Sequence, residues 1–388
     1  MEIKFYNLPQ PKPFNSLLIT EKPSFVSYRP DFVLLKKIAE KFQFKKNLVI
    51  IGHGGSITTF LGIYNALEYK TSKRAFFIST IDPDYISKVK KQVNPDDTVV
   101  IAISKSGETV TQLEALMAFS EFEQIFITGA AGPLAEIAGK LQATTIVHPP
   151  IGGRYTGLTE VALLPAALCG FDVEAIYESG QELLVKFEQD NIVYELASSF
   201  SMLEEDGVVE IFMPFYKKAL FPFSNLIVQL CHESYGKDGR GQTFFAHEAP
   251  ESQHHTNQRF FGGRKNIAGW FVSTTNDISD IEINVPAELQ SITLKEKNLS
   301  LLDKTSLSTS LRYERDATIE DAKVQNITIV DMQLASLSEK ECGQLIAFWQ
   351  MFAVYSASLR GVNPFDQPQV ESSKAISFSK RLAAKGHL

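Results

Sequence analysis

The chain has 388 residues, enough for two domains, and its 44% apolar and 21% charged residues are typical of a globular protein with a large core. Its net charge of −7 argues against a basic surface for nucleic acid, so any anionic ligand must be bound by a few donors in a pocket. Three cysteines without C-x-x-C spacing indicate neither a zinc site nor a disulfide framework. With no signal-peptide pattern and no apolar stretch of roughly 18 residues, we expect a cytoplasmic protein that does not enter a membrane.

The first part of the chain predicts an N-terminal arm followed by an α/β domain. The arm, residues 1–45, contains five prolines and a helical stretch over Phe32–Phe42. The apolar run Asn47–Ile51 then ends in GHGGS, which is typical of a buried strand that enters a tight loop. Further strands are expected at Ala75–Ile78, Thr98–Ile103, Gln124–Thr128 and Thr144–Val147, with helices at Thr111–Phe119 and Gly132–Lys140. Such alternation indicates a parallel sheet, so we assign residues 46–170 to a first α/β domain with ligands at the carboxyl ends of its strands.

The second part of the chain predicts a similar unit. A helix-like segment, Val173–Ser199, is expected to link the halves over residues 171–200, and a second α/β domain follows over residues 201–345. Its expected strands are Val208–Met213, Ile267–Ser273, Asp280–Asn284 and Val324–Val330. Helices are expected at Glu339–Leu359 and Ser372–Lys385, the latter in a C-terminal helical segment over residues 346–388. The predicted fold class is therefore α/β, with two domains that each have a mostly parallel sheet flanked by helices in three layers.

Four side-chain donors lie in the segment SKSGET, directly after the predicted strand Thr98–Ile103. The donors are Ser104, Lys105, Ser106 and Thr109. A strand that turns into a helix also presents unpaired N–H groups and a partial positive charge, which together bind phosphate. One such side chain would be enough to cap a helix, so four of them favour a phosphate site over a simple cap.

A second loop of this kind, Gly54-Gly55-Ser56, follows the strand Asn47–Ile51. Because the carboxyl ends of parallel strands meet at one edge of a sheet, we expect the two loops to lie side by side, with Gly55 and Ser56 contacting the substrate. This pair of loops resembles the sugar isomerase (SIS) domain, which implies that the ligand is a sugar phosphate.

The other motifs, in their order along the chain, resemble the glucose-6-phosphate isomerase family, whose members have two SIS domains. They are Gly152–Thr156 (GGRYT), Leu158–Leu168 (LTEVALLPAAL), Gln229–Gly236 (QLCHESYG), Gln253-His254, and Asp366–Lys374 (DQPQVESSK). Each motif is modest alone, but the ordered set covers most of the chain.

Moving a carbonyl between C1 and C2 of a hexose phosphate requires a base that takes a proton from one carbon and returns it to its neighbour through a cis-enediol. The resemblance assigns this role to Glu233, which would otherwise be a solvated glutamate near a helix end. It lies four residues after Gln229, hence on the same helical face, and Gly236 is expected to end the helix. The resemblance gives Arg154 the stabilisation of the enediolate charge.

The hexose arrives mainly as a ring, and the resemblance implies that a histidine and a lysine open it. These are His254 and Lys374 here, with the adjacent His255 as an open alternative to His254. Gln229 and Gln367 are expected to contact the substrate. The family's histidine comes from the other subunit, which implies a homodimer with a shared active site. No metal or other cofactor is expected, because no helical HxxxH pair accompanies the histidines.

The expected function is therefore the reversible isomerisation of glucose 6-phosphate and fructose 6-phosphate, in glycolysis and gluconeogenesis. Two alternatives stay open: a dual phosphoglucose/phosphomannose isomerase, and a non-catalytic SIS protein that only binds a sugar phosphate. The isomerase half of a glucosamine-6-phosphate synthase is disfavoured, because its glutaminase domain begins with a catalytic cysteine at position 2 and this chain begins Met1-Glu2.

Overall fold

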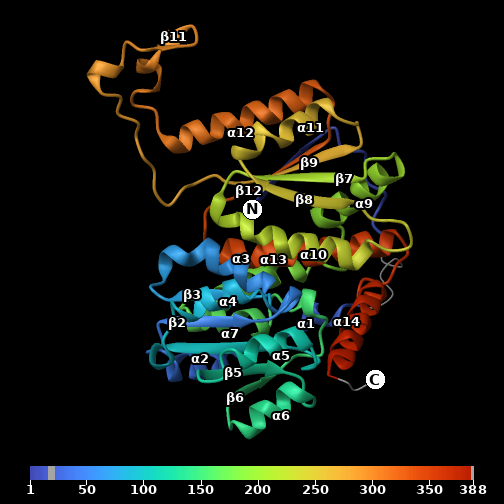
Figure 1. The fold of residues 1–388 in the computed structure, drawn as a ribbon. Helices are drawn as coiled ribbons and strands as arrows, with labels where there is room; N and C mark the ends of the chain where they lie inside the picture. The colour runs from blue at the N-terminus through green and yellow to red at the C-terminus, as the bar shows by residue number, and fades with distance from the viewer. Residues whose placement is uncertain (16–21, 386–388) are drawn as a thin grey trace.

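The computed structural model describes residues 1–15 and 22–385, and contains two five-stranded sheets separated by a layer of helices (Figure 1). Parts of the predicted arm (16–21) and of the predicted C-terminal segment (386–388) lie outside the described residues. Each sheet is flanked by helices, so the predicted α/β class with two such units is confirmed. The domain boundaries themselves stay a prediction.

The first sheet is parallel throughout, in the order β3-β2-β4-β5-β6. Its strands are β2 (Asn47–Ile51), β3 (Arg74–Ile78), β4 (Thr98–Ser104), β5 (Glu123–Thr128) and β6 (Thr144–Val147). The helices of this half are α1 (Ser24–Ser27), α2 (Phe32–Lys41), α3 (Thr58–Leu67), α4 (Pro83–Lys90), α5 (Val110–Met117) and α6 (Pro133–Lys140). All five predicted strands are present. β2 and β4 are buried over their whole length, as expected for central strands of a parallel sheet.

The second sheet has the order β1-β12-β9-β7-β8, in which only β1 is antiparallel to its neighbour. Its strands are β1 (Glu2–Tyr6), β7 (Glu210–Phe215), β8 (Thr243–Glu248), β9 (Ile267–Thr274) and β12 (Ile329–Leu334). The helices that follow in this half are α10 (Ser224–Tyr235), α11 (Thr256–Gly262) and α12 (Leu307–Val324).

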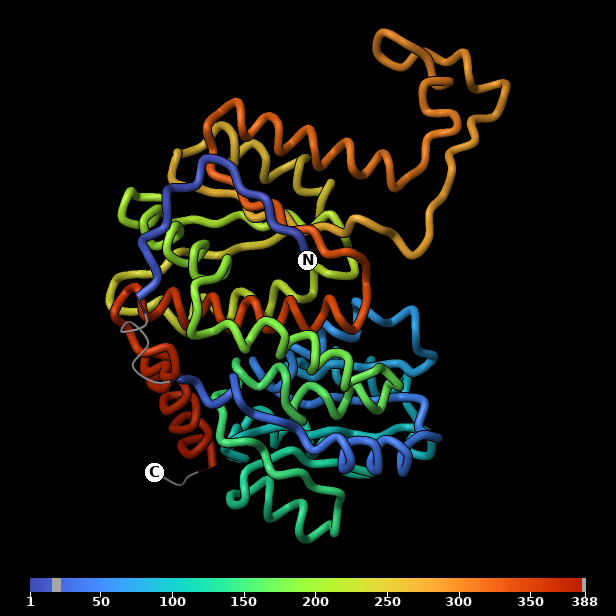
Figure 2. The backbone as a smooth tube through the Cα atoms, turned by 180° about the vertical axis from the view of Figure 1, so that it is seen from behind, coloured from blue at the N-terminus to red at the C-terminus, as the bar shows by residue number. Residues whose placement is uncertain are grey.

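The long helix α13 (Glu339–Leu359) runs between the two sheets (Figure 2) and has 16 of its 21 residues buried. It packs against α8 (Val173–Leu184) and α9 (Ile192–Glu205), while α7 (Glu160–Leu168) packs against α2. The approach of α13 to α8 is close enough that a Cβ on Gly343 would stand 1.9 Å from the carbonyl oxygen of Ile176. The described helices are each too short or too polar to span a lipid bilayer.

Three predicted elements differ from the structure. The linking segment Val173–Ser199 is two helices, because Asn191 starts a new one by accepting hydrogen bonds from the backbone N–H groups of Val193 and Tyr194. The expected strand Asp280–Asn284 is wrong, since only one bridge, between Glu282 and Ser306, forms there.

The third difference concerns residues 324–330: Val324 ends α12, and the strand begins only at Ile329. The strands β1 and β8 were not expected from the sequence.

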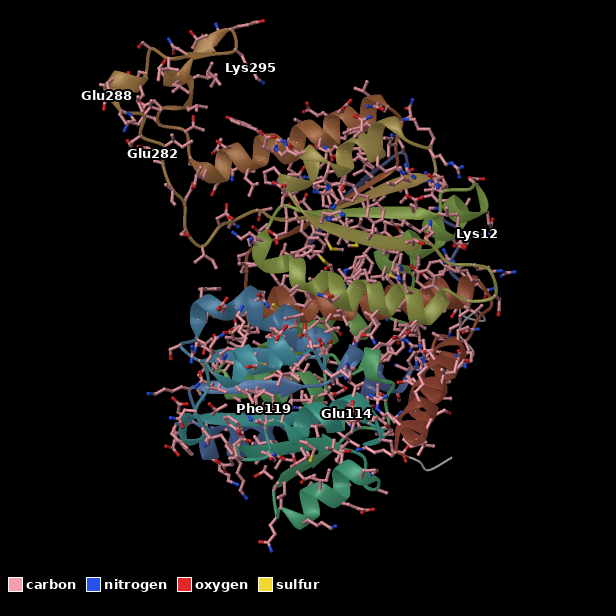
Figure 3. The ribbon with its side chains drawn as sticks, in the orientation of Figure 1. Lys12, Glu114, Phe119, Glu282, Glu288 and Lys295 are labelled. Atoms are coloured by element: carbon pink, nitrogen blue, oxygen red, sulfur yellow. The ribbon has the colours of Figure 1, made fainter. Side chains whose placement is uncertain are left out.

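Residues 275–306 leave the second sheet as an excursion that projects from the body of the molecule (Figures 1 and 3). It holds the small hairpin of β10 (Thr293–Leu294) and β11 (Lys297–Asn298). Figure 3 shows Glu282, Glu288 and Lys295 on this excursion, remote from the helical layer. The last helix, α14 (Glu371–Ala384), lies on the outside of the first half with no buried residue.

Candidate active site

The loop after β2 is pressed against two other segments. Gly54 has φ +52, and a Cβ there would stand 2.5 Å from Nε2 of Gln229. A Cβ on Gly55 would stand 2.1 Å from the carbonyl carbon of Gly153, so the loop lies directly on the GGR turn. Only glycine fits at both positions, and this contact brings α10 and the turn Gly153–Tyr155 to the edge of the first sheet.

The loop after β4 is the predicted phosphate segment. Ser104 Oγ accepts a hydrogen bond from the N–H of Gly107 at 3.1 Å, and Ser106 Oγ accepts one from Glu108 at 3.3 Å, so both hydroxyls shape the turn. Thr109 is the residue before α5, yet its side chain makes no capping hydrogen bond. Thr109 therefore presents a hydroxyl where the helix begins, and Lys105 is exposed beside it.

The two loops are joined by a histidine. Nε2 of His53 lies 3.0 Å from Oγ1 of Thr111 in the first turn of α5. His53 is half-buried, and this burial lowers the pKa of its imidazole. Gln112 adds a second link, because its Nε2 donates to the carbonyl oxygen of Ile51 at 2.9 Å. The expected proximity of the two loops is thus present in the structure.

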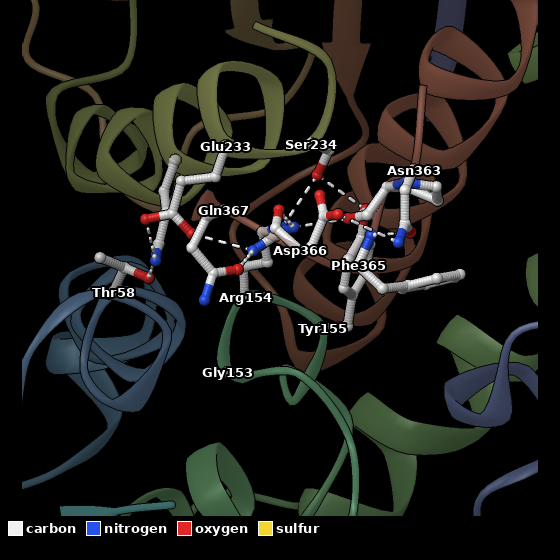
Figure 4. Close-up of polar contacts among 12 residues, drawn as sticks. Thr58, Gly153, Arg154, Tyr155, Glu233, Ser234, Asn363, Phe365, Asp366 and Gln367 are labelled. Carbon is white, nitrogen blue, oxygen red and sulfur yellow. Dashed lines mark hydrogen bonds and ion pairs between the residues drawn. The ribbon is translucent and has the colours of Figure 1, made fainter. Parts of the chain in front are cut away.

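Arg154 lies at the centre of the site (Figure 4) and is only 3% exposed. Its guanidinium makes five hydrogen bonds, as many as it has N–H groups. The acceptors are Ser234 Oγ at 3.0 Å from Nε, Glu233 Oε2 at 3.1 Å and Gln367 Oε1 at 2.8 Å from Nη1, and the carbonyl oxygens of Pro364 at 2.5 Å and Asp366 at 3.0 Å from Nη2. This network fixes the orientation of the positive charge.

Glu233 lies on α10 with its side chain 33% exposed, so its carboxylate is accessible as well as anchored. One oxygen accepts from Arg154 and the other accepts from Gln229 Nε2 at 3.2 Å. Gln229 in turn accepts from Thr58 Oγ1 at 3.3 Å, which ties the pair to the start of α3 (Figure 4). A carboxylate beside a fixed guanidinium can take up a proton while the neighbouring charge stabilises an oxyanion.

Some residues of the site were not expected from the sequence. Lys237, Ser234 and Thr58 all contribute contacts, and the only signal for Lys237 is that it follows the helix-ending Gly236. Tyr155 also belongs here, since its hydroxyl lies 2.7 Å from Ser234 Oγ and burial raises its pKa to about 12.

The two residues expected to open the sugar ring are not part of this cluster within one chain. His254 is exposed at the end of the turn Glu251–His254, and Lys374 pairs on the surface with Glu371 at 2.8 Å. Across the described residues, no hydrogen bond or ion pair joins either side chain to Arg154 or Glu233.

The neighbouring histidine, His255, is engaged locally. Its Nδ1 lies 2.6 Å from Thr256 Oγ1, and its ring centroid lies 5.0 Å from that of His247.

No group of three or more potential metal ligands occurs within residues 1–15 and 22–385.

A comparison with known families shows which family this fold and these motifs belong to. The family described as phosphoglucose isomerase matches residues 39–385. The chain belongs to this family. The resemblance inferred from the motifs is thereby confirmed, and with it the enzyme class of an aldose–ketose isomerase.

Similar proteins cover most of the chain. A glucose-6-phosphate isomerase of Listeria monocytogenes serotype 4b (strain F2365) is 28% identical over 384 residues, covering 90% of this chain and 83% of the relative. The glucose-6-phosphate isomerase of Rubrobacter xylanophilus is 29% identical over 338 residues, covering 82% and 76%.

Two solved structures share the fold. The crystal structure of a glucose-6-phosphate isomerase from Chlamydia trachomatis has a TM-score of 0.77 at 17% identity and covers 99% of this chain and 82% of its own. A hypothetical protein from Thermus thermophilus has a TM-score of 0.81 at 24% identity and covers 90% and 87%. At these identities the likeness shows the fold alone.

Proposed function

We propose that this phosphoglucose isomerase family member interconverts glucose 6-phosphate and fructose 6-phosphate by proton transfer through a cis-enediolate. The observation that carries the proposal is the direct contact of Arg154 with Glu233 at 3.1 Å, next to the glycine loop at the carboxyl end of the first sheet. Glu233 takes the proton from C2 of the open aldose, and the electron pair of that C–H bond forms the enediolate. The same carboxyl returns that proton to C1, while the hydroxyl proton of O2 passes to O1, so that C2 becomes the carbonyl carbon and the ketose is formed without any cofactor.

Arg154 has a defined way to engage the substrate. All five of its N–H groups are already bonded, so an oxygen of the enediolate must replace one of the present acceptors. Gln367 is the acceptor that suits this exchange, because its amide is half-buried. When its bond to Arg154 breaks, the amide oxygen can bind water, whereas a buried carbonyl oxygen would be left without a partner at a higher cost in free energy. Gln367 therefore holds the place of a substrate oxygen in the free enzyme.

The phosphate of the hexose is assigned to the loop after β4. The start of α5 supplies N–H groups, and Ser106, Thr109 and Lys105 supply side-chain donors at the same edge of the sheet. Gly55 and Ser56 belong to the neighbouring loop, Gly54–Ser56, and are assigned to the sugar.

Ring opening is assigned to His254 and Lys374. The exposure of His254 and its separation from the Arg154–Glu233 cluster support a homodimer in which the histidine of one subunit serves the site of the other. We assign the reaction to glycolysis and gluconeogenesis in the cytoplasm, where hexose phosphates are formed and used.

A coupled assay tests this function. Purified protein is given fructose 6-phosphate, and glucose 6-phosphate is read through its oxidation, with mannose 6-phosphate assayed beside it and with excess EDTA in a parallel arm. Glucose 6-phosphate formation that withstands EDTA is expected. Equal turnover of mannose 6-phosphate would make the enzyme a dual isomerase, and binding without turnover would make it a sugar-phosphate-binding protein.

A further inference from the structure

Residues 363–367 form a short segment that places Gln367 next to Arg154 and accepts hydrogen bonds from two buried cations. The first is Arg154, which binds the carbonyl oxygens of Pro364 and Asp366. The second is Lys237, whose side chain is 7% exposed although it follows the end of α10 by only two residues. Figure 4 shows Arg154 beside Asp366 and Gln367 of this segment.

Lys237 uses every donor it has on this segment. Its Nζ donates to the carbonyl oxygen of Asn363, to the carbonyl oxygen of Asp366 at 2.7 Å, and to the Asp366 carboxylate at 2.6 Å. The ammonium group has three N–H donors, so the three contacts saturate it. The hydrogen bond from Lys237 also holds the pKa of the Asp366 carboxyl below its ordinary value.

The carbonyl oxygen of Asp366 is shared by the two cations, since it lies 3.0 Å from Arg154 Nη2 and 2.7 Å from Lys237 Nζ. A carbonyl oxygen has two lone pairs, so it can accept from both cations, and the carboxylate of the same residue offsets one of the two charges. The position of Arg154 Nη2 is therefore coupled to Lys237 through a single backbone atom. Arg154 Nη1, on the same rigid guanidinium plane, is the group that contacts Glu233.

We propose that Lys237 is a positioning residue of the isomerase site: it holds residues 363–367 so that the guanidinium of Arg154 faces Glu233 and the substrate oxygen. The proposal rests on the proposed function. Among the described residues, the hydrogen bonds of the Lys237 ammonium group go to the segment and not to Glu233 or the phosphate loop, so its effect on the reaction passes through the segment. Without its charge the segment loses three contacts, and the three of the five Arg154 acceptors that lie on this segment are no longer held by a second cation.

The test compares Lys237→Met with a matched control. Lys45 is also buried and also binds two carbonyl oxygens, those of Pro95 at 3.2 Å and Asp96 at 3.1 Å, and one carboxylate, Glu123 at 3.1 Å. It lies before β2, at the end of the first sheet opposite the glycine loop. Lys45→Met therefore removes the same kind of contacts without touching the active site.

For Lys237→Met we expect kcat on fructose 6-phosphate to fall at least tenfold while KM changes less than threefold, because orientation is lost and phosphate binding is kept. Hydrogen exchange of residues 362–371 should rise in this variant and not in Lys45→Met, whose kcat should stay within twofold of wild type. Lys237→Arg, which keeps the charge, should recover part of kcat.

A folded Lys237→Met enzyme with kcat within threefold of wild type overturns the proposal, and so does a tenfold rise in KM at unchanged kcat. If Lys237→Met does not fold, Asp366→Asn decides, because it breaks the ion pair and leaves both carbonyl contacts. A threefold or larger loss of kcat in Asp366→Asn then supports the proposal, and an unchanged kcat rejects it. A wild-type protein without isomerase activity would instead reject the proposed function.

Discussion

At the scale of single residues, Glu233 is anchored by Arg154 and Gln229 yet keeps one third of its side chain exposed. Replacing it with glutamine preserves its size but removes the group that accepts a proton from carbon. We expect Glu233→Gln to lower kcat by at least about a hundredfold, the scale of a lost general base. The measurement is kcat in the coupled assay, with the melting temperature as the control for folding. Turnover within tenfold of wild type would remove Glu233 from the mechanism.

The hydroxyls of Ser106 and Thr109 are expected to bind the phosphate, so the double variant Ser106→Ala with Thr109→Ala should raise KM for fructose 6-phosphate. A lost hydrogen bond to a charged group is worth about 1.5–3 kcal/mol, which corresponds to a KM increase of at least about tenfold. Free fructose, which lacks the phosphate, is the matched substrate control. A KM that does not change would place the phosphate elsewhere.

His232 makes the stability of the fold depend on pH. Its Nε2 accepts a hydrogen bond from the N–H of Phe244 at 2.9 Å, so the imidazole is neutral, and burial lowers its pKa below the ordinary 6.5. As pH falls, the unfolded chain binds this proton before the folded one does. The stabilisation is therefore complete above pH 6.5 and is lost as pH falls from there through the lower folded-state pKa.

Urea denaturation between pH 8 and pH 5 measures this loss. His232→Gln, whose amide oxygen can still accept from Phe244, should show a smaller drop in unfolding free energy over that range. A variant whose pH dependence equals that of wild type would show that His232 is not the responsible group.

The residues of the cluster differ in how far the sequence predicts them. Arg154, Glu233, Gln229 and Gln367 stand in local motifs, and the structure joins them by hydrogen bonds. Lys237 has no such signal, because a lysine just after a helix is solvated by default. It is buried only by a segment 126 residues further along the chain, which no local pattern reveals.

At the scale of elements, the contact of α13 with α8 depends on Gly343. A Cβ there would meet the carbonyl oxygen of Ile176 at 1.9 Å and Ser179 Oγ at 2.3 Å, so the helices would have to separate. We expect Gly343→Ala to lower the unfolding free energy by about 1–3 kcal/mol. Gly139→Ala in α6 is the control, because nothing lies within 4 Å of its Cβ and alanine favours a helix by up to about 1 kcal/mol. Equal stabilities of the two variants would contradict the close packing.

Elements with a strong local pattern were predictable from the sequence, and elements that depend on distant partners were not. The strands Asn47–Ile51 and Thr144–Val147 match β2 and β6 residue for residue, since both are short segments rich in β-branched or apolar residues. The segment Asp280–Asn284 alternates in the same way as a strand, but it lies on the excursion, away from the edges of both large sheets. Conversely, β1 is a strand only because β12 lies beside it.

At the scale of the whole molecule, the shared site can be tested by mixing variants. In a dimer of one Glu233→Gln subunit and one His254→Ala subunit, one of the two sites has both wild-type residues if His254 is supplied across the interface. Random pairing of the two inactive proteins after unfolding and refolding should then restore about a quarter of the wild-type activity. His255→Ala, a change at the adjacent histidine, is the control: it should lower kcat only slightly, so this variant should be active without mixing. No recovery in proven mixed dimers would place His254 and Glu233 in the same subunit's site, or outside a site altogether.

The pairing of β1 with β12 also bears on how the protein is made. Lys4 faces Asp331, so the ribosome must add more than 300 residues before this edge strand meets its partner. At roughly 5–20 residues per second, that interval is on the order of half a minute, during which Glu2–Tyr6 has already left the exit tunnel. The first sheet, by contrast, is complete once Val147 has emerged. Translation thus lets the half that carries both the glycine and the phosphate loops close first, and it leaves Glu2–Tyr6 without its partner until β12 has emerged.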